Sequence, residues 1–275
     1  MIQNNFTVLP FYSDLKYQHS NKPYAFGAIY PLYASAKSLL PFQFTVNHVA
    51  DTAIAENDGE LIKKILLVNI DTGLSTSISS LVSDFIYRKV YSTSDCVYYA
   101  ADTVFDRNLA QGQYYIYIQF ADDQEVYSEV ITVVDNIEDY LKIIWWDKED
   151  LEFDSGFIAY NSIGFKNVLY LNTDIGKPDY KFEEDGKERD GYFFAEKQLS
   201  EKVYRFTFVA PEYLCDAVRF IRLSDNVHVY KNGIDYIVDS FLANVAWQEQ
   251  GDLAAVDVEF RTNTVVKKIA AAWPK

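Results

Sequence analysis

The sequence predicts a mainly β protein built from two β-sandwich-like domains. Aromatic residues make up 16% of the 275 residues, with 22 Tyr and 19 Phe, and such side chains favour pleated, half-buried surfaces. Short apolar runs recur along the chain between turn signals, which is the pattern of antiparallel strands. Because domains commonly span about 50 to 200 residues, a chain of this length predicts two of them.

The first domain is predicted over residues 40–136 as a sandwich of the immunoglobulin or fibronectin type. Its expected strands are "PFQFTV", "KKILLVNI", "DFIYRKVY", "QYYIYIQF" and "EVYSEVITVV", with turns at "ENDG", "DTG", "LAQG" and "ADDQ". Gly112 followed by Tyr114, Tyr115 and Tyr117 resembles the late strand of such a sandwich. In that strand a Tyr near the start bonds back to the preceding corner.

Residues 1–39 are interpreted either as an N-terminal arm or as extra strands. They carry Tyr24, Tyr30 and Tyr33 among other tyrosines, and prolines that prevent a long helix. An arm packed on a neighbouring molecule would use these rings as contacts, but they would equally serve to cover the sandwich. Deletion of residues 1–36 without effect on assembly would exclude the exchanged arm.

The second domain, residues 137–275, is predicted to be β-rich with one short helix near residues 211–223. Leu214, Ala217, Val218 and Ile221 recur there at helical spacing, and Pro211 suits a first turn. Near the end of the chain, "WQEQGDLAAVDVEF" contains many carboxylates and suggests an active site. The strand period explains them better, because Val256, Val258 and Phe260 alternate with acidic residues that would face solvent.

Charge and cysteine content narrow the classes of partner. A net charge of −15 disfavours nucleic acid and anionic membranes. Cys96 and Cys215 are far apart in the sequence, so they support neither a disulfide framework nor a zinc cluster. No signal peptide and no long apolar segment is recognised, so membrane insertion is not expected.

The sequence contains only weak candidates for catalytic or metal sites. The pair Trp145 and Trp146 beside Asp147 and Glu149 could form a sugar-stacking platform, although adjacent strand residues point to opposite sides. No nucleophile elbow, phosphate loop or dinucleotide motif occurs, and the acidic run "YKFEEDGKERDG" fits a solvated hairpin tip better than a calcium loop. We therefore expect no enzyme activity, no metal and no cofactor.

Three segments carry a resemblance to a known class of protein: "YLKIIWWDKEDLEFDSGFIAYNS", "VYRFTFVAPEYLCDAVRFIRLSD" and "WQEQGDLAAVDVEFRTNTVVKKIA". They resemble structural proteins encoded in the tail modules of phages and prophages of Bacteroidetes-type bacteria, and the first half resembles the immunoglobulin-like domains of such virion proteins. The resemblance implies a non-enzymatic subunit of a tail, baseplate or related virion assembly.

That resemblance implies other virion proteins as partners, a homo-oligomeric ring with unlike contacting patches, and localisation in the virion after assembly in the host cytoplasm. The alternative is a carbohydrate-binding module or adhesin that uses exposed aromatic side chains on a cell-surface glycan. The candidate contact residues under either hypothesis are Tyr24, Tyr30, Tyr33, Trp145, Trp146 and Trp247.

Overall fold

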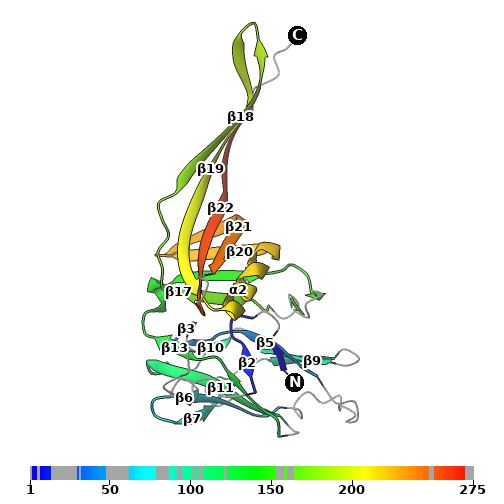
Figure 1. Cartoon of the computed structure of the whole chain (residues 1–275), viewed down its shortest axis with the longest axis vertical. Helices are drawn as coiled ribbons and strands as arrows, with labels where there is room; N and C mark the ends of the chain where they lie inside the picture. Colours follow the sequence, from blue (N-terminus) through cyan, green and yellow to red (C-terminus); the bar gives the residue numbers. More distant parts are fainter. Residues whose placement is uncertain are drawn as a thin grey trace.

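The chain forms a body with a long β arm projecting from it (Figure 1). The computed structural model describes residues 2–4, 7–13, 30, 32–47, 62–78, 87–91, 95–100, 103–104, 108–120, 123–152, 158–159, 164–247 and 251–269. These residues are mainly β, as predicted, with one short α-helix, α2 (Glu212–Arg219).

Two sheets face each other in the N-terminal domain. The first has the order β1 (Ile2–Asn4), β5 (Phe42–Asn47), β9 (Asp95–Ala100), β8 (Tyr87–Tyr91). The second joins β2 (Phe11–Tyr12), β12 (Glu125–Ser128), β11 (Gly112–Phe120), β13 (Ile131–Val134) and β3 (Leu32–Ser35), with β6 (Ile62–Asn69) and β7 (Ser75–Ser77) beyond β11. A separate ribbon pairs β4 (Ser38–Leu39) with β10 (Thr103–Val104).

This strand order is that of an immunoglobulin-like sandwich. Across each sheet in space, the first sheet corresponds to strands A, B, E and D, and the second to G, F, C and C′. The two inner faces meet in a common core, where the rings of Phe11 and Phe42 lie 4.9 Å apart. The N-terminal residues contribute to both sheets, because β1 pairs with β5, β2 with β12, and β3 in parallel with β13.

The expected tyrosine contact at the start of the late strand is confirmed. The Tyr114 hydroxyl donates a hydrogen bond of 3.0 Å to the carbonyl of Ala110. The closing strand differs from the prediction, because it is divided into β12 and β13. Its interruption follows from Ser128, whose Oγ accepts the backbone N–H of Ile116 at 2.8 Å in place of a ladder carbonyl.

The C-terminal domain is built on one antiparallel sheet of seven strands. Their order is β17 (Asn167–Leu171), β14 (Leu141–Trp146), β20 (Asn226–Lys231), β21 (Ile234–Trp247), β22 (Ala254–Ile269), β19 (Tyr192–Ala210), β18 (Asp179–Arg189). A short ribbon pairs β15 (Leu151–Glu152) with β16 (Ile158–Ala159), and η2 (Ile137–Asp139) and η4 (Phe220–Leu223) are single 3₁₀ turns. The Asn232–Gly233 turn joins β20 to β21 with positive φ at both residues, as their types favour.

Helix α2 confirms the predicted helix, and its buried residues belong to a hydrophobic core that includes residues of both domains. It buries Leu214, Cys215, Ala217 and Val218, and together with η4 it packs against β21 and β22. One hydrophobic cluster includes this helix and both domains. Strand β17 contacts β3, and the rings of Tyr33 and Tyr140 lie 4.6 Å apart where the domains meet.

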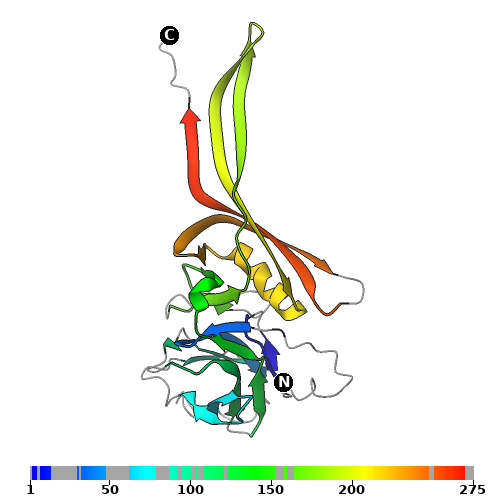
Figure 2. The same cartoon turned by 90° about the vertical axis from the view of Figure 1, so that its left-hand side faces the viewer.

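Three strands of this sheet extend beyond the body and form the arm, which Figure 2 shows from the side. Strand β19 runs unbroken for 19 residues, from the arm into the body. Its hairpin with β18 closes at Asp190 and Gly191, which have φ of 52° and 80°. The acidic run that was predicted as a hairpin tip is therefore strand β18, and only its last two residues form the turn.

Candidate interaction surfaces

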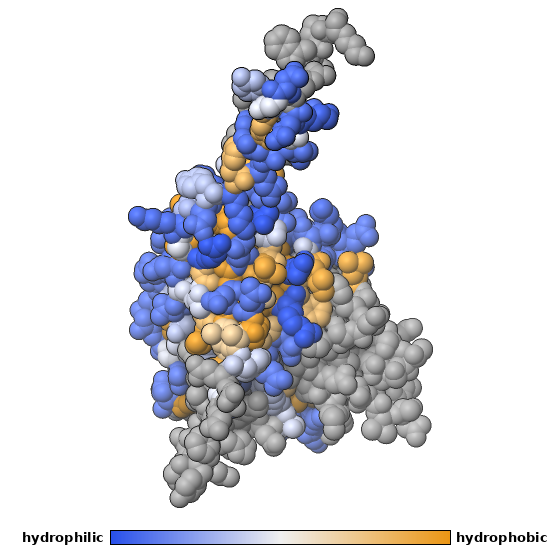
Figure 3. All heavy atoms as spheres, turned by 45° about the horizontal axis from the view of Figure 1, so that its top comes forward, coloured by the Kyte–Doolittle hydropathy of each residue, from blue (hydrophilic) through white to orange (hydrophobic). Residues whose placement is uncertain are grey.

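The arm consists of β18, residues 192–202 of β19 and residues 263–269 of β22. At about 3.3 Å per residue, the 11 residues of β18 extend roughly 36 Å. Figure 3 shows hydrophobic side chains on this otherwise hydrophilic arm. Phe182 is 61% exposed and Tyr192 is 71% exposed, and Tyr180 and Phe193 are also exposed. The arm therefore presents large aromatic side chains that the described core does not use.

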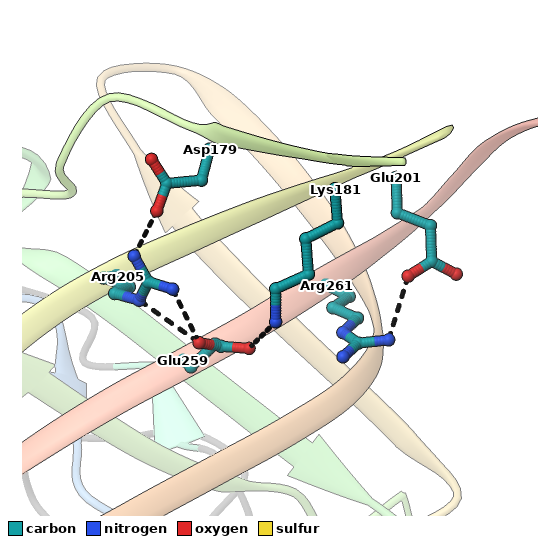
Figure 4. Close-up of polar contacts among 6 residues, drawn as sticks. All are labelled: Asp179, Lys181, Glu201, Arg205, Glu259 and Arg261. Atoms are coloured by element: carbon teal, nitrogen blue, oxygen red, sulfur yellow. Dashed lines mark hydrogen bonds and ion pairs between the residues drawn. The ribbon is translucent and has the colours of Figure 1, made fainter. Parts of the chain in front are cut away.

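A network of ion pairs lies at the root of the arm (Figure 4). The Glu259 carboxylate on β22 accepts a hydrogen bond of 2.9 Å from Lys181 of β18, and further hydrogen bonds of 2.9 and 3.1 Å from Arg205 of β19. Arg205 also pairs with Asp179 of β18. These contacts join the three strands where they leave the body.

The network lowers the pKa of the Glu259 carboxyl group below its ordinary value. The cause is its hydrogen bonds to Lys181 and Arg205, which outweigh the opposite effect of burial. A second pair, between Arg261 and Glu201 at 2.9 Å, connects β22 with β19 slightly further along the arm. Asp257 and Glu259 thus lie on the polar face of β22, as the alternation predicts, while Val256, Val258 and Phe260 are buried.

Both long edges of the arm are open among the described residues. Strand β18 ends the sheet on one side. On the other side β21 pairs with β22 only as far as Thr262, so residues 265–269 of β22, the part of the arm whose register with β19 is regular, pair with β19 alone. An unpaired edge presents backbone N–H and C=O groups that can add a further strand.

A different surface lies on the face of the C-terminal sheet opposite the helix. The ring of Trp146 lies 5.0 Å from that of His228, and the Lys166 ammonium is 4.4 Å from the Trp146 ring centroid. His228 on β20 is half-buried, and its Nδ1 lies 3.0 Å from the Asp235 carboxylate. Aromatic and cationic groups are thus held together on this face.

A pocket of about 380 Å³ lies at the end of the same face. Tyr140, Tyr170 and Tyr230 line it, together with Lys142, whose ammonium lies 5.6 Å and 5.9 Å from the centroids of the Tyr170 and Tyr230 rings. Lys231 also lines the pocket. Its ammonium group donates hydrogen bonds to the backbone carbonyls of Asp139 and Thr173, so it is already engaged in contacts within the protein. The sequence pattern did not reveal this pocket, because its residues come from separate strands and turns.

Three of the six contact residues predicted from the sequence are buried or partly buried in the fold. Trp145 is 1% exposed and belongs to the core, which excludes it as a surface contact in this fold. Tyr30 and Tyr33 pack against the core, and Tyr33 contacts the second domain rather than facing solvent. Burial, with Tyr33 and Cys215 nearby, raises the pKa of Tyr30 to about 12.

The remaining predicted residues lie on different parts of the surface. Trp146 belongs to the aromatic face described above, and Trp247, 49% exposed, ends strand β21. Tyr24 lies outside the described residues. The structure therefore does not unite these residues in one site, and the aromatic residues of the arm were missed. The sequence does contain a sign of these residues, because Tyr180 and Phe182 alternate with charged residues in "DYKFEE". The many charged residues around them hide this strand pattern.

The acidic residues next to the tryptophans have a structural role. Asp147 is buried, and its Oδ1 accepts the backbone N–H of Asp225 at 3.2 Å. The Asp225 carboxylate in turn accepts the backbone N–H of Lys148 at 3.1 Å. Burial raises the pKa of Asp147, and the reciprocal contacts fix two adjacent loops.

Over the residues that the structure describes, no cluster of three or more His, Cys, Asp or Glu side chains could hold a metal ion. The same residues include no helix that is long and apolar enough to span a membrane.

Comparison with known proteins gives little guidance. No protein-family model and no curated protein matches the chain. One matching solved structure is the crystal structure of Dpr2 Ig1-Ig2 in complex with DIP-Theta Ig1-Ig3. It is 10% identical over 86% of this chain and 88% of that chain, with a TM-score of 0.17. A likeness at this level carries no argument, so the assignment of the N-terminal sandwich depends on its strand order and tyrosine contact.

Proposed function

We propose that this protein is a non-enzymatic structural subunit that acts through protein–protein contacts, and that the arm is its principal contact element. The observation that carries the proposal is the projecting arm itself, with its open edges and exposed aromatic side chains. Aromatic residues are enriched at the cores of protein interfaces, because they bury a large area at a small cost in side-chain entropy.

The contacts within the arm also support a role in binding another molecule. Phe182 contributes nothing to the described core, and the ion pairs around Glu259 stabilise the arm only at its root. A long ribbon without a covering layer is costly as an isolated element, because two-stranded and three-stranded ribbons need a packed face for stability. A partner that covers one face or pairs with one edge would supply it.

We further propose a phage tail, baseplate or related virion assembly as the setting. This part of the proposal is supported by the sequence resemblance alone. In such an assembly the body would form lateral contacts and the arm would engage the neighbouring subunit.

The test is the size of the particle that contains this protein when it is expressed from its own gene in its native cell. Size-exclusion chromatography of the lysate, followed by detection with an antibody, should show the chain at a mass far above 31.7 kDa. A matched variant in which residues 183–199 are replaced by Asn-Gly, so that Phe182 and Ser200 remain paired beside the turn, should shift toward the monomer. Elution of the unaltered chain at 31.7 kDa would contradict the proposal.

A second candidate function, glycan binding, is favoured by the aromatic face and the pocket. Aromatic rings stack on the apolar faces of sugars, and Tyr170, Tyr230 and Trp146 lie on adjacent strands. A glycan array with the purified chain tests this function. Binding that is lost in Tyr230→Ala and kept in Tyr192→Ala would support it, and an array without signal would exclude it for the glycans present.

A further inference from the structure

The strand register places residues of opposite charge at the same level on the two open edges of the arm. In β18 the exposed residues Glu183 and Glu184 follow one another, and in β22 the corresponding positions are Lys267 and Lys268. The register fixes this correspondence: Glu183 pairs with Leu199, which pairs with Lys267, and the next row is Glu184, Gln198 and Lys268. Each of these two rows therefore begins with a glutamate on the β18 edge and ends with a lysine on the β22 edge.

We propose that the arms of two copies of this chain join edge to edge, with β18 of one copy pairing in parallel with residues 263–269 of β22 of the next. This inference rests on the proposed function and names the partner of the arm. Within one chain β18 and β22 both run antiparallel to β19, so they point in the same direction. Copies related by rotation about an axis along their arms therefore bring unlike edges together as parallel neighbours.

Three consecutive positions are complementary when the rows of the two arms stay level. Phe182 then lies beside the position of Val266 in the next copy, because Phe182, Ser200 and Val266 form one row. Glu183 lies beside the position of Lys267, and Glu184 beside that of Lys268. Cross-strand pairs of apolar residues and of opposite charges are the pairs that stabilise sheets.

The alternative pairings are disfavoured by the same residues. Two β18 strands in contact would bring Glu183, Glu184 and Asp185 of both copies together, and two β22 ends would bring four lysines together. Like charges opposite one another destabilise a strand pair. The charges therefore select one pairing of the three, and the selected one is heterologous: each copy uses one edge for each neighbour and the contact can be repeated in a ring.

The first test is the mass of the full-length chain by light scattering across a concentration series. We expect oligomers well above 31.7 kDa in the unaltered chain and monomers in Glu183→Lys/Glu184→Lys. The reverse variant, Lys267→Glu/Lys268→Glu, should also be monomeric. The chain with all four substitutions restores opposite edges and should recover the oligomer, which a variant with a damaged fold would not do.

The second test fixes the contact by cross-linking. In Glu184→Cys/Lys268→Cys the two new thiols are two strand spacings apart within one chain, about 9.6 Å, which is too far for a disulfide. Oxidation should therefore link different copies and give a ladder of dimers, trimers and larger species on a non-reducing gel. Glu184→Cys alone is the matched control and should give no ladder beyond the background of the native thiols.

Either of two results would overturn the edge pairing: a monomer at every concentration, or an oligomer whose mass the charge reversals leave unchanged. The fate of the proposed function is judged separately from the particle in the native cell. A chain that is monomeric when pure but elutes in a large particle from the lysate would retain the structural role and lose the self-pairing.

Discussion

Two phenylalanines of the C-terminal sheet illustrate the difference between a residue that stabilises the fold and a residue proposed to contact a partner. Phe260 on β22 is 0% exposed, and its ring contacts Tyr204 at 5.2 Å and Tyr236 at 5.8 Å. Phe182 on β18 belongs to the same sheet but is 61% exposed. The same substitution, Phe→Ala, should therefore have opposite consequences at the two positions.

Phe260→Ala should lower the free energy of unfolding of the C-terminal domain by about 3 to 5 kcal/mol, because it removes a buried ring and leaves a cavity. Phe182→Ala should change it by less than about 0.5 kcal/mol, since the ring is already largely hydrated. Urea denaturation followed by tryptophan fluorescence measures both, with the buried indole of Trp145 as a reporter in the same sheet.

The order of the two variants should be reversed when assembly is measured instead of the free energy of unfolding. Phe182→Ala should reduce the mass of the oligomer in solution at a concentration where the unaltered chain is assembled. If Phe182→Ala destabilised the monomer as much as Phe260→Ala does, the arm would be part of the folding core. Exposure of an aromatic side chain on the arm would then not identify a contact residue.

Further predictions concern single contacts. Tyr114→Phe should cost about 1 kcal/mol of stability of the N-terminal sandwich in urea denaturation, because it removes the hydrogen bond to the corner; Tyr117→Phe, on the same strand but bonded to an exposed carboxylate, is the control and should have little effect. The pKa of Glu259 is lowered in the folded state, so its stabilising effect is present above the unfolded pKa and is lost as the pH falls through the folded pKa. The stability difference between the unaltered chain and Glu259→Gln should therefore shrink as the pH falls below about 4.5. Burial, with help from neighbouring carboxylates, raises the pKa of the Cys215 thiol to about 11; its labelling by a thiol reagent at pH 8 should be slow and should accelerate on unfolding in urea, and fast labelling of the folded chain would contradict its burial.

The strand pattern could be predicted from the sequence where a strand has one buried face. In β22 the alternation of Val256, Val258 and Phe260 with acidic residues gave both the strand and its buried side. In β11 the Tyr114 contact was predictable because a short-range corner determines it. Both predictions depend on periodicity or local geometry, which a sequence contains directly.

The arm could not be predicted in the same way, because both of its faces are largely solvated. Residues 183–188 of β18 show no hydrophobic alternation, so their strand conformation depends on pairing with β19. Trp145 was misassigned for a related reason. Two adjacent tryptophans indicate that one faces the core, but the sequence does not say which, and the register of β14 decides it.

The two edge strands of the C-terminal sheet differ in a way that supports the proposed partner of the arm. Strand β17, "NVLYL", is buried at all five positions and lies against β3 of the N-terminal domain. Strand β18, "DYKFEEDGKER", is mostly exposed and pairs with β19 alone. The chain thus closes one edge with apolar residues and its own second domain, and leaves the other edge open with charges. Charges that only prevented association could have the same sign on both open edges. The sequence instead places acidic residues on β18 and lysines at the corresponding register positions of β22, as the proposed pairing of unlike edges requires.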